Sequence, residues 1–576
     1  MWMSKYFDSY WSLFSFICLA LFMGLFYQVA WQYPVTDGFP LIERLLDSNF
    51  IKQDFYTNTF EEFSPRLATA KFIVAISVAL DMDYTLVIAY GNIIRIWLYA
   101  IALYCLFYNL TDKKTALLAF SFSALSFLSM PFLPAWWPIS YDLTSSNIAL
   151  VFAMFSWVLA VRGAVSSTFI LLALTVHIHP VVGVQALLIS LLIYFCIYKV
   201  DGLLTSLRNI KVYISAIAFL TVFLITYFSF EQVLPDKDFI AINGQFRHAH
   251  HFEFSHMEIE KWLSTILMVS ACLIITKWHN RKGECRDLIT IPIAIYSTLM
   301  VFLGYVFAEL YPTRFMISFI PLRAFPILVP IIMLAFARLA INRFDNKDYL
   351  SFFLLFLPFL PYNHIGLTWY LLPNHHSMVL PIIITTLVLT IIIIQMNYRI
   401  ISDLTNRQLD RIIRSDFGVS LLPISLFAIA LTLIKFEIDI PKLNTEPGIY
   451  SWINLNTDKD SIIISELNAA DNQKIRLVAR RAVVISKDFP FNENFYHEWK
   501  DRYVDIYLHR DHARGRIDGL TENQLNELAD KYKATHLIRT KRLLNEKHFT
   551  LVGNSLGENN TAYIYENNNL SVMAAL

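Results

Sequence analysis

The chain has 576 residues, of which 56% are hydrophobic and only 16% are charged, and its mean hydropathy is +0.48. Soluble domains do not have this composition, and many apolar runs approach the roughly 20 residues that cross a bilayer. The net charge of +1 argues against nucleic acid as a partner. The five cysteines form no CxxC pair, which argues against redox chemistry and a disulfide framework.

The apolar runs predict an α-helical polytopic membrane protein with about thirteen transmembrane helices. In chain order the runs lie near 12–31, 85–110, 115–131, 143–161, 165–179, 181–198, 212–230, 259–276, 288–308, 321–340, 349–361, 377–396 and 417–436. The first run is long for a signal peptide and lacks an A-x-A-like cleavage site. We therefore interpret it as a retained first span.

Basic residues fall in alternate loops, which fixes an orientation by the positive-inside rule. These loops are expected to be cytoplasmic, and they lie near 113–114, 199–211, 277–286, 338–347 and 399–414. The N-terminus is then cytoplasmic, and the first loop, 32–66, is external. The apolar segment 67–80 is short, and a juxtamembrane or re-entrant helix there preserves the alternation. A short span at 67–80 that breaks the rule once is the alternative.

The composition changes after about residue 440, so we expect a transmembrane domain over 1–440 and a soluble external domain over 441–576. Short apolar runs at 461–464, 482–485, 550–552 and 562–565 predict strands. Thr521 and Gln524 form a capping box that predicts a helix as far as Tyr532. The sequence thus indicates a small external α/β or α+β domain.

The first loop carries three candidate site residues. Asp37 lies just beyond the first span on a Gly/Pro-flanked turn, where its carboxylate could act as a general base or hold a divalent metal. Capping of the following helix is the alternative role for Asp37. Asp54 is a second candidate catalytic acid, and Arg66 could hold a phosphate bidentately. We interpret Glu43 and Arg44 as a solvated helix face.

Histidines gather in the loops predicted to be external. His248, His250 and His251 closely follow Arg247, which is a candidate for binding phosphate. These histidines could contact sugar or phosphate oxygens, ligate a transition metal, or lie in an exposed loop without a fixed partner. Since their spacing matches no closed zinc site, direct ligand contact is the preferred interpretation, and the identity of any metal stays open.

Three further residues lie near the ends of predicted spans. His179 precedes Pro180, which permits a helix break of the kind allowed at membrane depth only in a cavity or inside protein. His179 is therefore a candidate substrate-binding residue, with a satisfied core histidine as the alternative. Arg314 and Arg323 flank a short apolar stretch and could clamp a phosphate or pyrophosphate, or reach out to lipid phosphates.

The arrangement of a first span, a long external loop with an early acid, many further spans and an external C-terminal domain resembles the class C membrane glycosyltransferases. This superfamily includes oligosaccharyltransferases, protein mannosyltransferases and aminoarabinose transferases, and the likeness covers the whole chain loosely. In that family the early acid is the catalytic base or a metal-associated residue, and Asp37 is the matching position. The chain departs from the common pattern because Gly38, not a second acid, follows Asp37.

The resemblance implies a donor sugar linked to a polyprenyl phosphate or pyrophosphate, with basic residues holding the phosphate. The expected function is therefore glycosyl transfer on the external face, in envelope glycan or glycolipid modification, with the lipid-linked donor and membrane lipid as partners. The alternatives are a polysaccharide polymerase or ligase acting on lipid pyrophosphates, and a transporter or structural protein. The stretches 246–252 and 54–56 also resemble uncharacterised bacterial multi-spanning proteins. This resemblance implies a bacterial inner membrane with the C-terminal domain on its periplasmic side.

Overall fold

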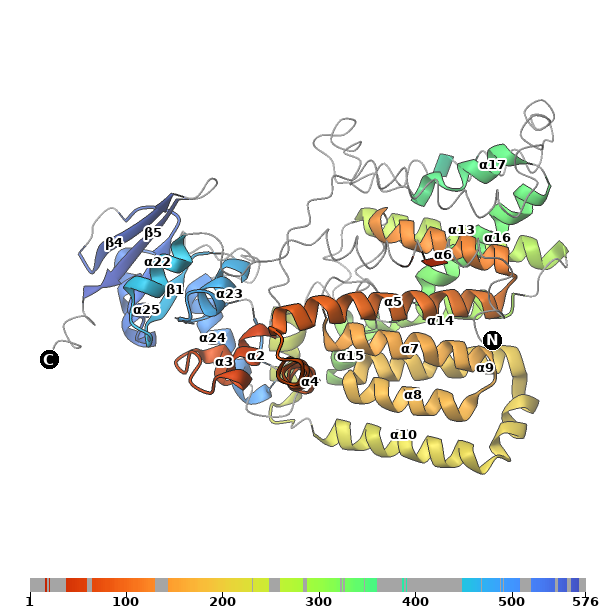
Figure 1. The fold of residues 1–576 in the computed structure, drawn as a ribbon, viewed down its shortest axis with the longest axis horizontal. Coiled ribbons are helices and arrows are strands. Elements are labelled where there is room, and N and C mark those ends of the chain that lie inside the picture. Colours follow the sequence, from red (N-terminus) through yellow and green to blue (C-terminus); the bar gives the residue numbers. More distant parts are fainter. Residues whose placement is uncertain are drawn as a thin grey trace. The chain divides into compact units, whose positions relative to one another are not determined.

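A computed structural model of the chain gives two compact units (Figure 1). It describes residues 38–59, 65–129, 143–229, 232–247, 259–282, 287–321, 327–346, 348–359, 448–467, 469–486, 488–490, 492–507, 520–543, 547–556 and 561–568, with isolated positions elsewhere. The helical unit comprises 1–31, 89–227 and 249–438, and the α/β unit comprises 32–88, 228–248 and 439–576. The α/β unit therefore contains more than the C-terminal domain, while the predicted division at 440 stays a prediction.

The helical unit consists of apolar helices joined by short turns. Its described elements are α5 (Tyr84–Leu110, whose first residues belong to the α/β unit), α6 (Lys113–Ser129), α7 (Ser145–Val161), α8 (Val165–Ile178), α9 (Pro180–Leu207), α10 (Ile210–Phe228), α13 (Ile259–Lys282), α14 (Thr290–Gly304), η4 (Tyr305–Leu310), α15 (Arg314–Phe319), α16 (Leu328–Asp345), α17 (Tyr349–Leu354) and η6 (Leu357–Phe359). Helix α9 has non-helical backbone at Lys199, where the predicted span 181–198 has just ended.

Four described helices are long and apolar enough to cross a membrane: Tyr84–Leu110, Pro180–Gly202, Ile210–Phe228 and Thr290–Leu310. The predicted spans from 85–110 through 321–340 all coincide with described helices. Several of these helices are shorter or carry more charge than the four that are able to cross a membrane. The predicted span 349–361 is not one helix, because a turn separates α17 from η6, where Pro358 has no amide hydrogen to donate. The runs 12–31, 377–396 and 417–436 lie almost wholly outside the described residues, so the total of thirteen stays a prediction.

Helix ends predicted to lie on the same side of the membrane meet in the structure. Arg162, after α7, donates from Nε to Asn109 Oδ1 of α5 at 2.9 Å. Arg338 of α16 forms a buried ion pair with Asp287, which precedes α14, and donates from Nη2 to the Leu110 carbonyl at 3.0 Å. These contacts agree with alternate loops lying on one side. Which side is cytoplasmic stays a prediction.

The α8–α9 hairpin depends on the absence of a side chain at Gly183. A Cβ atom there would lie 2.5 Å from Cα and 2.3 Å from Cγ2 of Val176, so the backbones of the two helices would have to separate. We expect Gly183→Ala to lower stability by about 1–3 kcal/mol, the usual cost of overpacking. The thermal midpoint of the detergent-purified protein measures this loss. Gly91→Ala is the control, because it meets only the side chain of Leu143. Equal shifts for the two variants would refute the backbone clash.

The α/β unit combines a mixed sheet with helices from three parts of the chain. Its described elements are α2 (Phe39–Leu46), α3 (Phe55–Asn58), α4 (Pro65–Leu80), α11 (Asp236–Phe239), η2 (Ile240–Arg247), α22 (Ile449–Asn456), β1 (Ile462–Ser465), α23 (Ala469–Leu477), β2 (Ala482–Val483), η7 (Glu493–Phe495), α24 (Tyr496–Tyr507), α25 (Glu522–Tyr532), β3 (His536–Arg539), β4 (Phe549–Leu556) and β5 (Thr561–Asn567).

The five strands have the order β2-β1-β3-β5-β4. Strands β2, β1 and β3 are parallel, and β5 is antiparallel to both β3 and β4. A buried cluster that includes Ile453, Ile463, Ile475, Ile538 and Ile564 joins the sheet to α22 and α23. The four predicted strands are confirmed, as is the capping box that starts α25. The sheet also contains β3, which the sequence did not predict.

Helix α4 is a single helix of 16 residues that contains the ambiguous segment 67–80. Three of its apolar side chains, Phe72, Val78 and Leu80, are exposed by 60–68%. An apolar helix of this length is too short to span a bilayer without tilt or distortion, and its outward apolar side chains suit contact with lipid. Its place as a juxtamembrane or re-entrant helix stays a prediction.

His536 of β3 gives the sheet a defined pH dependence. Burial lowers the pKa of His536 from 6.5 to about 4; Asp458 opposes this shift and Arg481 adds to it. Because the unfolded chain binds the proton first, His536 destabilises the fold as pH falls from 6.5 to 4, by a total of about 3 kcal/mol. We expect His536→Asn to flatten this part of the denaturant midpoint-against-pH curve. An unchanged slope would contradict this origin.

Candidate functional site

The first loop begins with a helix that is anchored by its apolar face. Helix α2 has Gly38 at its N-cap and Pro40 in its first turn, and Phe39, Pro40, Leu41 and Ile42 are buried. It packs on α4 and on α23 of the C-terminal domain. The position that immediately follows Asp37 in the chain is therefore fixed within the α/β unit.

Arg44 ties α2 to the turn that follows it. Its Nη1 donates to the Phe50 carbonyl and its Nη2 to Asn58 Oδ1, both at 2.5 Å. Glu43 accepts a hydrogen bond of 2.8 Å from the Tyr84 hydroxyl. The interpretation of these two residues as a solvated helix face was wrong, because Arg44 joins two parts of the loop and Glu43 joins the loop to the start of α5.

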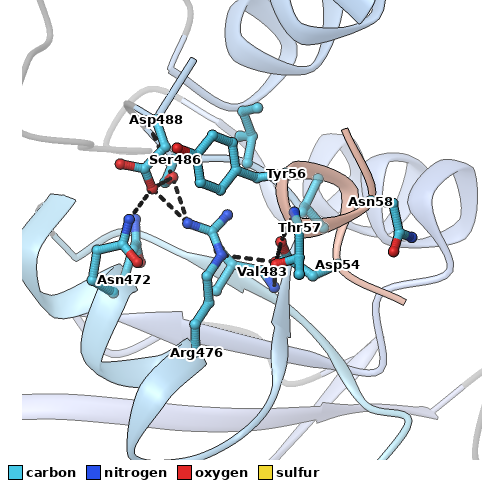
Figure 2. A network of polar contacts seen from close by, with 12 residues as sticks. Asp54, Tyr56, Thr57, Asn58, Asn472, Arg476, Val483, Ser486 and Asp488 are labelled. Carbon is cyan, nitrogen blue, oxygen red and sulfur yellow. Dashed lines mark hydrogen bonds and ion pairs between the residues drawn. The ribbon is translucent and has the colours of Figure 1, made fainter. Parts of the chain in front are cut away.

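Asp54 lies at one end of a buried polar network (Figure 2). It caps α3, and its Oδ1 accepts from the backbone nitrogen and the hydroxyl of Thr57, both at 2.8 Å. Its Oδ2 accepts from Arg476 Nε at 2.8 Å and from the Val483 nitrogen at 3.1 Å. Asp54 is 0% exposed, and these four donors match the acceptor capacity of a carboxylate. The predicted catalytic role would require release of one of these bonds.

Arg476 of α23 connects Asp54 to a second buried carboxylate, Asp488 (Figure 2). Its Nη1 donates to Asp488 Oδ2 at 2.5 Å and to Ser486 Oγ at 2.9 Å. Its Cζ lies 5.2 Å from the centroid of the Tyr56 ring. Burial alone would lower the pKa of Arg476, but Asp54 and Asp488 raise it above its ordinary value, so the guanidinium stays charged.

Three arginines of the C-terminal domain stack on three aromatic side chains of the first loop. The pairs are Arg476 with Tyr56, Arg480 with Phe50 and Arg502 with Phe55, with Cζ to ring centroid distances of 5.2, 5.1 and 4.5 Å. Cation–π contacts of this kind attract about 0.5–2 kcal/mol each. The turn from Asp47 to Asn58 is thus bound along α23 and α24 as a docked segment.

A second segment, 232–247, is fixed at its start and at its end on the same domain. Near its start, Glu493 Oε2 accepts from the backbone nitrogens of Val233 and Leu234, both at 3.0 Å. Near its end, Phe246 packs edge-on against Trp499 of α24, with ring centroids 5.9 Å apart. The histidine-rich stretch that follows this segment in the sequence therefore starts from a fixed position.

Arg247 lies at that starting position. Its Cζ lies 3.6 Å from the centroid of the Phe489 ring, and its Nη1 donates to Asn243 Oδ1 at 3.1 Å. Stacking engages the face of a guanidinium, whereas a phosphate is bound by N–H groups in its plane. The predicted phosphate contact by Arg247 is therefore compatible with this packing and stays a prediction.

The remaining candidates are placed as follows. Asp37, His248, His250, His251 and Arg323 lie outside the described residues, as does the side chain of Arg66, whose backbone belongs to α4. His179 is the N-cap of α9, where its Nδ1 accepts from the Val182 nitrogen at 3.4 Å. Arg314 is the half-buried first residue of α15. The structure thus brings Asp54 and Arg247 into the α/β unit, and His179 and Arg314 into the helical unit.

Among the described residues, no group of three or more His, Cys, Asp or Glu side chains is arranged to hold a metal ion. Asp54 does not fit as a metal ligand, because all four of its acceptor positions are taken by protein donors. Sequence reasoning did not single out Arg476, Asp488, Glu493, Phe489 and Arg502, which hold the two segments in place.

Comparison with known proteins assigns no family to the whole chain. Residues 445–506 match a domain of unknown function, DUF6798. No curated protein matches. Three solved structures of the oligosaccharyltransferase from Archaeoglobus fulgidus cover 93% of this chain and 70% of their own, at 11–12% identity and TM-scores of 0.39–0.41. One is tethered to an acceptor peptide, one is in complex with an inhibitory peptide and a dolichol-phosphate, and one is the apo form.

Proposed function

We propose that the protein is a membrane glycosyltransferase that takes its sugar from a polyprenyl-phosphate-linked donor on the external face of the membrane. The sequence supports this through the resemblance to class C enzymes, with Asp37 at the position of the early acid. Four described helices are long and apolar enough to cross a membrane, which would place the protein in the bilayer that holds the polyprenyl chain of such a donor.

The observation that carries the proposal is the docking of two segments on one domain. The part of the first loop that follows Asp37 is bound through Asp54 and Arg476. The segment 232–247, which precedes the histidines, is bound through Glu493 and Phe246. A transferase needs its base and its donor-binding groups held in one fixed geometry. Two far-separated loops with candidate site residues, both anchored on one domain, meet that need.

In the proposed reaction Asp37 removes the proton from an acceptor hydroxyl. The acceptor oxygen forms a new bond to the anomeric carbon of the sugar, and the bond from that carbon to the phosphate oxygen breaks. The polyprenyl phosphate leaves with the electron pair and is stabilised by arginines. The candidates for that contact are Arg66, Arg247, Arg314 and Arg323. His179, His248, His250 and His251 are proposed to bind sugar or phosphate oxygens. Asp54 is proposed to position the loop and not to act on substrate.

Native mass spectrometry of the detergent-purified protein tests the proposal. We expect a co-purifying polyprenyl phosphate in the wild type and a larger sugar-loaded fraction in Asp37→Asn, because the mutant binds the donor without consuming it. Asp47→Asn is the matched control, since Asp47 is an acid of the same loop with 45% exposure and an ion pair to Arg480. Only bulk phospholipid in all three samples would overturn the proposed function.

A further inference from the structure

We propose that Arg476 is a positioning residue for the transfer reaction, which through Asp54 holds the first-loop segment 38–59 that follows Asp37 in the chain. The inference rests on the proposed function, and it concerns a residue that makes no contact with substrate in this account. Its basis is a chain of contacts from the C-terminal domain to α2, which is buried at Asp488, Arg476 and Asp54.

The first link fixes Arg476 from the side of the domain. Asp488 Oδ2 accepts from Arg476 Nη1, and it also accepts hydrogen bonds from Gln473 and Ser486. Arg476 is 0% exposed and Asp488 is 4% exposed, so water does not compete for these bonds. The guanidinium therefore has one orientation, set by groups of α23 and of the segment after β2.

The second link passes this orientation to the first loop. Arg476 presents Nε to Asp54, whose other oxygen caps α3 through Thr57. Helix α3 is joined to α2 by Arg44, which bonds to Asn58 at the end of α3. Arg44 lies in the last turn of α2, so we infer that release of Asp54 loosens the described segment 38–59, which directly follows Asp37 in the chain.

Only an arginine can make this connection. Its planar guanidinium bonds Asp54 at one edge and Asp488 at another, with distances of 2.8 and 2.5 Å. A lysine offers one compact charge on a flexible stem, and it cannot hold two carboxylates in a fixed relation. The adjacent pair of Arg480 and Asp47 is different in kind, because both side chains are nearly half exposed. Exposed ion pairs of this kind contribute little to fixing a structure.

The test compares Arg476→Lys and Asp54→Asn with Arg480→Lys in the full chain. A displacement of about 1 Å at a reacting group can cost about 100-fold in rate. We therefore expect Arg476→Lys and Asp54→Asn to lower kcat by about 10–100-fold, with KM for the lipid-linked donor within about threefold of wild type. Arg480→Lys should leave both constants near wild type. An unchanged kcat in folded Asp54→Asn would overturn the proposal, as would a loss of activity that tracks the thermal midpoint in all three variants.

Hydrogen exchange separates this proposal from the proposed function. In Arg476→Lys and Asp54→Asn, amides of 38–59 should exchange at least about tenfold faster than in the wild type, while amides of α7, α8 and α9 keep the wild-type rate. If the wild type transfers no sugar, the proposed function fails. Faster exchange confined to 38–59 would then still support Arg476 as the residue that holds the loop, whereas unchanged exchange would overturn that role as well.

Discussion

Asp37→Asn is expected to lower the rate of sugar transfer by about 10²–10⁴-fold. The amide has nearly the shape of the carboxylate but cannot accept a proton, and general base catalysis contributes a factor of that size. Because the donor phosphate is held by other residues in this account, KM for the donor should change little. Single-turnover transfer by the reconstituted protein, with the lipid-linked sugar that co-purifies, measures the chemical step directly.

The control for this experiment is Asp47→Asn in the same loop, whose exposed side chain pairs with Arg480. Its rate should stay within about twofold of wild type, as expected for an exposed ion pair. Full activity in Asp37→Asn would remove Asp37 from the reaction. Loss of activity in His250→Ala and Arg314→Ala but not in Asp37→Asn would favour the polymerase or ligase reaction.

Arg476→Met is expected to lower the free energy of unfolding of the α/β unit by about 3–5 kcal/mol. Removal of the guanidinium leaves Asp54 and Asp488 buried without their cation, and the penalty for a stranded buried charge is of that size. Methionine keeps most of the side-chain volume, so loss of packing contributes little.

Denaturant unfolding, followed by hydrogen exchange of amides in the sheet and in α24, measures this loss. The companion variant is Asp54→Asn/Arg476→Met, in which one of the two stranded carboxylates is gone. It should recover part of the lost stability, which gives a coupling energy between the two positions. A loss below about 1 kcal/mol for Arg476→Met, typical of an exposed ion pair, would show that the network contributes little.

The local elements of the fold could be predicted because each rests on a pattern within a few residues. The four apolar runs of the C-terminal domain became strands, and the capping box at Thr521 starts α25 as expected. Strand β3 was missed, because its four residues begin with His536 and end with Arg539, so they form no apolar run. Pairing between β1 and β5 buries both ends of β3, which is a tertiary effect.

The candidate site could be predicted only in part. Asp54 was recognised as a notable acid, but its partner Arg476 is 422 residues away in the chain, a separation that no local pattern bridges. A signal for Arg476 did exist, since a charged residue lies between Ile475 and Leu477 on a helix next to strands. Arg44 was misinterpreted for the same reason, because its partners belong to the turn that folds back on α2.

The grouping of the segments also lay beyond the sequence. The change of composition near residue 440 marks where apolar spans end, and it says nothing of which earlier loops join the domain. The structure adds 32–88 and 228–248 to that unit through contacts of Asp54, Val233 and Arg247 with the C-terminal domain. Buried ion pairs and aromatic stacking across such separations depend on the complete fold.

The central claim is that the protein binds a polyprenyl-phosphate-linked sugar, and a competition titration tests it most directly. Purified protein is titrated in native mass spectrometry with a synthetic polyprenyl phosphate and with phosphatidic acid of the same headgroup charge. We expect at least about tenfold tighter binding of the polyprenyl phosphate, which corresponds to about 1.4 kcal/mol. Equal affinity for the two lipids would contradict the claim, because it would reduce the interaction to one between a membrane protein and anionic lipid.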